Sequence, residues 1–80
     1  MTARNAGPFL SWAETRRLAA LFRDSFGGRT QKDVAQTAGW SESKLHEVLR
    51  AVRRMRPGDA LALAGVLGVD ANELELEGAQ

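Results

Sequence analysis

The stretch from Thr30 to Arg50 reads TQKDVAQTAGWSESKLHEVLR, and it predicts two short amphipathic helices separated by very few residues. The first begins after Thr30, has Asp33 at its third helical position, and ends at Gly39, where glycine permits a left-handed turn. Ser41 caps the second helix. A connection this short forces the two helices to cross steeply, so small side chains must form their contact.

The residues around this crossing fit that requirement. Ala35 and Ala38 are the small residues of the first helix, and Trp40 is placed to cover the junction with apolar surface. We expect Trp40 to be a core residue rather than a base-stacking platform. In the second helix, one buried face with the spacing i, i+3, i+4, i+7 predicts that the helix runs past Arg50. That face consists of Leu45, Val48, Leu49 and Val52.

Glycine and proline divide the whole chain into about five short helices, and no segment alternates strictly as a strand does. A helix capped by Ser11, with Glu14 in the reciprocal position, precedes the central pair and is expected to stop at Gly27 and Gly28. Its buried residues are predicted to be Leu18, Leu21, Phe22 and Phe26. After the pair, we expect one helix from Pro57 to Leu67 and a short one after Asp70, with Glu73 in the reciprocal position.

Length and composition indicate one globular domain. A chain of 80 residues cannot divide its core, and 44% hydrophobic with 26% charged residues is typical of a folded protein. We expect a single domain over residues 1–80, with its core at about 11–76 and flexible tails at 1–8 and 77–80. The absence of cysteine excludes disulfides, thiolate zinc sites and thiol catalysis. No apolar run is long enough for a signal peptide or a membrane span, so we expect a cytoplasmic protein.

Charge is distributed unevenly along the chain. Residues 1–56 contain all eleven lysines and arginines and five acids, whereas residues 57–80 contain five acids and no base. One half is therefore suited to a polyanion and the other repels it, although chance clustering on a solvated surface is the alternative.

Several positions combine into one motif. Gln31 opens the first helix of the pair, an apolar residue and an alanine follow at Val34 and Ala35, and a glycine occupies the turn. Leu45 and Val48 anchor the next helix, and LAGVLGVDANEL, residues 63–74, forms the closing helices.

This pattern resembles the helix-turn-helix of the phage-repressor (Cro-like) and xenobiotic-response-element regulator family, over roughly residues 18–76. The resemblance implies an all-α, compact bundle of about five short helices, like the lambda-repressor DNA-binding domain. It also implies that the second helix of the pair enters the major groove of double-stranded DNA. The segment RAVRRMRPGD is shorter than the family's loop, so we expect a longer helix before it.

Candidate DNA contacts follow from helical geometry and side-chain chemistry. With the apolar face inward, the opposite side carries Ser43, Glu47, Arg50 and Arg54, with His46 and Lys44 flanking. Glu47 paired with Arg50 or Arg54 on the surface is the alternative interpretation. The candidate base-reading residues are Glu42, Ser43, Lys44, His46, Glu47 and Arg50. The candidate phosphate contacts are Arg29, Thr30, Gln31, Lys32, Ser41, Arg53, Arg54 and Arg56.

A single helix covers few base pairs, so we expect a homodimer on a palindromic operator, formed through the acidic C-terminal half. Its candidate interface residues are Phe9, Leu10, Trp12, Leu74 and Leu76. The helix after Pro57 is apolar almost all round, which fits burial in the domain centre better than burial against a second copy.

The function expected is a sequence-specific DNA-binding transcriptional regulator, a small phage or bacterial repressor that acts by operator occupancy. A regulatory protein partner is compatible with the absence of a sensor domain. The alternatives are an antitoxin, or a protein–protein adaptor or inhibitor built on the same fold. No catalytic constellation, metal-ligand set or cofactor motif occurs, so neither an enzyme nor a cofactor is expected.

Overall fold

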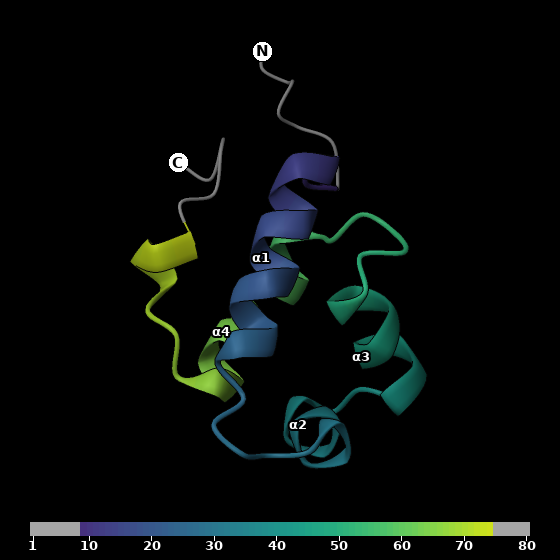
Figure 1. The fold of residues 1–80 in the computed structure, drawn as a ribbon, viewed down its shortest axis with the longest axis vertical. Coiled ribbons are helices and arrows are strands. Elements are labelled where there is room, and N and C mark those ends of the chain that lie inside the picture. The colour runs from purple at the N-terminus through teal and green to yellow at the C-terminus, as the bar shows by residue number, and fades with distance from the viewer. Residues whose placement is uncertain (1–8, 75–80) are drawn as a thin grey trace.

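The computed structural model describes residues 9–74, and within that range the chain is all helical, as predicted (Figure 1). Four α-helices are followed by one short 3-10 helix, which lies where the short fifth helix was expected. The elements are α1 (Trp12–Asp24), α2 (Gln31–Ala38), α3 (Glu42–Leu49), α4 (Pro57–Leu67) and η2 (Ala71–Leu74).

Local capping chemistry sets the start of α1, but not its end. The Ser11 hydroxyl accepts a hydrogen bond from the Glu14 N–H at 3.1 Å, as expected of an N-cap. The helix then stops at Asp24 with Ser25 as C-cap, so the predicted stop at Gly27 and Gly28 is wrong by about two residues. Both glycines nevertheless have positive φ, 62° and 89°, because the loop turns there toward α2.

The ends of α2 are as predicted. Thr30 and Asp33 form a complete capping box, and Gly39 adopts a left-handed conformation with φ 75°. The N–H of Trp40 reaches the Ala35 carbonyl at 2.9 Å, which closes the helix with a Schellman motif. Trp40 is thereby turned against the core, where it packs partly buried.

The expectation of a long third helix is wrong. α3 ends at Leu49, and the next turn is a second Schellman motif in which Ala51 takes the left-handed position with φ 54°. The Val52 N–H bonds to the Glu47 carbonyl and the Ala51 N–H to the Val48 carbonyl, each at 3.2 Å. The chain therefore leaves the helical path, and Val52, predicted to be buried, is 62% exposed.

The core lies where all four α-helices meet. α4 packs against α1, α2 and η2, and its Ala60, Leu63, Ala64 and Leu67 are buried in the domain centre, while Leu61 is 49% exposed. In Figure 1, α1 runs along the long axis, α4 lies behind it, and α2 is seen nearly end-on beside α3. The largest fully buried side chains are those of Phe22, Leu18, Leu45, Leu49, Met55, Leu63 and Leu74, while Leu21 and Phe26 are only partly buried.

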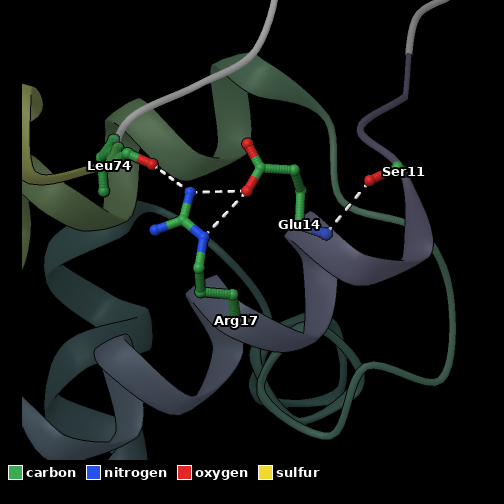
Figure 2. A network of polar contacts seen from close by, with 4 residues as sticks. All are labelled: Ser11, Glu14, Arg17 and Leu74. Atoms are coloured by element: carbon green, nitrogen blue, oxygen red, sulfur yellow. Dashed lines mark hydrogen bonds and ion pairs between the residues drawn. The ribbon is translucent and has the colours of Figure 1, made fainter.

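The C-terminal turn is attached to α1 by Arg17. Its Nη2 donates to the Leu74 carbonyl, and its Nε donates to Glu14 Oε1 at 2.9 Å (Figure 2). Leu74 itself is fully buried, and Leu10, near the other end of the described chain, is 6% exposed. Both residues therefore fold back on their own domain, and their assignment to a dimer interface is wrong. Leu76, also assigned there, lies outside the described residues.

No helix within residues 9–74 has both the length and the apolar character that crossing a bilayer requires.

Candidate nucleic-acid interface

The α2–α3 pair is held together by small and branched apolar side chains. Val34, Ala35 and Leu45 are 0–1% exposed, and Val48 is 2% exposed, so the inner sides of both helices are dry. Ala38 is only partly buried at the edge of the contact. This packing fixes the orientation of α3 against α2, and so fixes which face of α3 is turned outward.

The outer face of α3 is defined here as Ser43, His46, Glu47 and Arg50. Ser43, His46 and Arg50 are exposed, and Glu47 is half-exposed, with 47% of its side-chain surface accessible. Glu42, at the first position of the helix, is exposed as well. The structure thus leaves on the surface a hydroxyl, an imidazole, a carboxylate and a guanidinium, groups that can bond to base edges.

Glu47 has a different partner from either one considered in the sequence. Its Oε1 lies 3.5 Å from Arg53 Nε. The early end of α3 brings residue 53 back toward the helix and takes Arg54 off the helical stripe, so Arg54 does not extend the outer face. An ion pair this exposed contributes only about 0–1 kcal/mol to stability. Arg53 can therefore leave Glu47 and bind a DNA phosphate at little cost in free energy.

Lys44 is turned away from the outer face. Its Nζ lies 3.4 Å from Asp59 Oδ1 in the first turn of α4 and 4.3 Å from the centre of the Trp40 ring. The structure therefore separates Lys44 from the other candidate base-reading residues and places it on the flank of α3 that faces α4.

The chain between α3 and α4 forms a basic loop, residues 50–56. Met55 anchors it: this side chain is 1% exposed, its N–H donates to Thr15 Oγ1 at 3.0 Å, and its carbonyl accepts from the Leu10 N–H at 2.7 Å. Sequence reasoning missed both Thr15 and Met55, although a lone apolar residue within the run RRMR is a recognisable signal. The anchored loop presents Arg50, Arg53, Arg54 and Arg56 at the surface.

A cleft of about 510 Å³ opens between this loop and the start of α1. Within it, Arg54 and Arg56 place their guanidinium carbons 5.4 Å and 5.2 Å from the centre of the Phe9 ring, within the range of cation–π contacts. Phe9, Trp12 and Val52 are three of the four large apolar residues exposed within residues 9–74. The cleft is lined by Phe9, Trp12, Lys44, Val52, Arg53, Arg54, Arg56 and Asp59.

Two arginines have structural partners that the sequence did not reveal. Arg23 Nη1 donates to the Leu49 carbonyl and so satisfies the C-terminus of α3. Arg29, predicted to contact phosphate, donates from Nε to the Phe26 carbonyl at 3.1 Å and from Nη1 to the Val66 carbonyl at 2.9 Å. Arg29 thus ties the α1–α2 loop to α4, and only its remaining donor groups are available to DNA.

The N-terminus of α2 and the start of α3 place further polar groups at the surface. Thr30, Gln31, Lys32 and Ser41 are exposed. The Thr30 and Ser41 hydroxyls each accept a backbone N–H, from Asp33 at 3.1 Å and from Lys44 at 3.0 Å. A hydroxyl that accepts a hydrogen bond in this way keeps its own proton to donate. Each of the two capping hydroxyls can therefore donate to a phosphate oxygen while it still caps its helix.

Residues 9–74 contain no group of three or more His, Asp or Glu side chains placed to hold a metal ion. The exposed residues of α3, of the basic loop and of the α2 N-terminus carry many hydrogen-bond donors.

Comparison with known proteins adds one match. A family model described as "Helix-turn-helix domain" covers residues 13–76, which includes α2, α3 and the connection between them. No curated protein matches the chain.

Proposed function

This chain belongs to the helix-turn-helix domain family, a fold that binds DNA, and we propose that it is a sequence-specific transcriptional regulator of double-stranded DNA. In its finer form, the proposal is a small repressor of phage or bacterial type that acts by occupying its operator. Such a protein works in the compartment that holds the DNA, which in a bacterial cell is the cytoplasm.

The observation that carries the proposal is the outer face of α3 beside the basic loop. An α-helix with its side chains is about 10–12 Å across, and the major groove of B-DNA is roughly 12 Å wide, so α3 can lie in it. With α3 in the groove, His46 and Arg50 can donate to purine acceptors, and Glu47 can accept from cytosine N4. The basic loop on one side and the α2 N-terminus on the other then face the two phosphate backbones.

Charge supports the same orientation. Every lysine and arginine precedes residue 57, whereas residues 57–80 contain five acidic residues and no basic one. Docking through α3 and the basic loop brings the cationic part of the chain to the phosphates, and this favours both affinity and rapid association.

We propose further that the protein acts as a homodimer that reads two half-sites about one helical turn apart. Phe9 and Trp12 remain exposed and are the interface candidates within the described range, 38% and 44% exposed respectively. Sedimentation of the purified protein tests this: a monomer at micromolar concentration, both free and on DNA, contradicts it.

The decisive experiment for function is a selection of random duplexes with the purified protein, followed by sequencing. We expect one enriched palindromic site whose affinity falls by orders of magnitude between 50 and 200 mM salt, roughly 10³-fold for six phosphate contacts. No enrichment, together with no binding at low ionic strength, overturns the proposal.

A protein–protein adaptor is the second candidate, and the apolar residues of the cleft favour it, because phosphate binding explains the arginines but not Phe9, Trp12 and Val52. The salt titration separates the two, since a mostly apolar protein interface is nearly insensitive to salt in this range.

A further inference from the structure

Lys44 and Asp59 form an ion pair at the border of the proposed DNA surface. The side chains are 35% and 22% exposed, and the Nζ–Oδ1 distance is 3.4 Å. The centre of the Trp40 ring lies 4.3 Å from the same Nζ. Lys44 is therefore held by two residues from different parts of the fold, Trp40 from the α2–α3 turn and Asp59 from α4.

The position of Lys44 gives this pair a consequence for DNA binding. Lys44 points toward α4 in this structure, but it belongs to the first turn of α3, whose residues reach base edges in such a helix, so its long side chain can swing to the DNA once Asp59 releases it. A lysine in that turn is attracted to any phosphate, whatever the sequence nearby. The carboxylate of Asp59 competes for that attraction because it is already within ion-pair distance.

We propose that Asp59 is a specificity-determining residue that acts through Lys44. By holding the ammonium, it lowers the affinity for DNA of arbitrary sequence more than the affinity for a site that offers Lys44 a guanine. A guanine presents two acceptors, O6 and N7, and compensates better for the lost carboxylate than one phosphate oxygen does. The inference rests on the proposed function and adds to it a restraint within the protein.

Asp59 also has a plain structural role, because an acid in the first turn of α4 interacts favourably with the helix dipole. That role affects folding stability, and it changes neither the salt dependence of DNA binding nor the preference for one DNA sequence over another. The test therefore measures two properties of DNA binding: its salt dependence, and the ratio of the affinities for the selected site and for a random duplex. Thermal melting checks that each variant is folded.

Asp59→Asn removes the carboxylate charge and releases Lys44. We expect binding to a random duplex at 50 mM salt to tighten about fivefold, and the salt slope to steepen by up to roughly 0.9, the value for one more phosphate contact. Affinity for the selected site should rise less, so the selectivity ratio falls. Asp59→Glu keeps the charge and should retain the wild-type salt slope.

The second arm combines Asp59→Asn with Lys44→Met. If Asp59 acts through Lys44, the gain from Asp59→Asn disappears in the Lys44→Met background; a gain of the same size there overturns the proposal, because Asp59 then acts only through net charge. Glu73→Gln is the matched control: it makes the same charge change at an exposed position in η2 and should alter neither slope nor ratio.

The outcomes separate this inference from the proposed function. Wild-type binding with an unchanged slope and ratio in Asp59→Asn overturns the inference alone. Absence of binding by the wild type to any duplex at low salt overturns the proposed function, and the inference with it.

Discussion

The backbone N–H of Met55 donates to the hydroxyl oxygen of Thr15 across 3.0 Å, and this bond joins two residues forty positions apart in the chain. Thr15 is fully buried in α1, and Met55 is the only buried residue of the basic loop. The bond therefore connects the first turn of α1 directly to the loop that presents four arginines, and it makes the position of those arginines depend on the core.

The first prediction concerns this bond. Thr15→Val keeps the shape of the side chain but leaves the Met55 N–H buried without an acceptor, which should lower the free energy of unfolding by about 1–3 kcal/mol. Urea denaturation measures it. Thr37→Val is the matched control, because Thr37 is exposed and its hydroxyl donates to the Asp33 carbonyl at 3.0 Å, and a loss below about 0.5 kcal/mol is expected there. Equal losses in the two variants would contradict the importance of the buried bond.

The second prediction separates base contacts from phosphate contacts. Arg50→Ala removes a guanidinium from the outer face of α3, so it should relax sequence preference at one position of the operator by about 1–3 kcal/mol. Arg54→Ala removes a cation from the basic loop and should weaken binding to every duplex alike, with a salt slope shallower by roughly 0.9. Fluorescence anisotropy on the selected site and on single-base variants distinguishes them. If both variants bind all duplexes as the wild type does, α3 is not the recognition helix.

The third prediction tests the crossing of α2 and α3. Ala35 is 1% exposed at that contact, so Ala35→Leu inserts three carbon atoms where no space exists and should cost about 1–3 kcal/mol in stability. Ala62→Leu makes the same change at an exposed position of α4 and should be nearly neutral. Thermal melting of both proteins provides the comparison. An unchanged melting temperature for Ala35→Leu means that the two helices do not pack as described.

These elements differ in how far the sequence could predict them. The caps at Ser11, Thr30 and Ser41 and the turn at Gly39 were predictable because each depends on a few neighbouring residues. The outward direction of Ser43, His46, Glu47 and Arg50 followed as well, since helical periodicity alone sets it.

The predictions from the sequence failed where the structure depends on contacts between distant residues or on an unusual backbone conformation. Val52 continues the apolar spacing of α3, which predicted a longer helix. The helix ends because Ala51 adopts a left-handed conformation, which alanine rarely takes and which the sequence therefore does not indicate. The roles of Arg23 and Arg29 depend on carbonyls of α3 and α4, which the sequence does not bring near. Lys44 shared the helix start with Ser43, and only the packing of α4 shows that Asp59 holds it.

The last prediction concerns the left-handed residues that end α2 and α3, Gly39 with φ 75° and Ala51 with φ 54°. A side chain in this conformation costs roughly 1–2 kcal/mol, whereas glycine adopts it freely. Ala51→Gly should therefore raise the free energy of unfolding, by about 1 kcal/mol or less, because glycine also increases the entropy of the unfolded chain. Gly39→Ala should lower it by about 1 kcal/mol, through the backbone alone, since a Cβ there would meet no atom within 4 Å. Urea unfolding of both variants measures the two changes in the free energy of unfolding, which we expect to have opposite signs. A loss of stability in Ala51→Gly would contradict the left-handed end of α3.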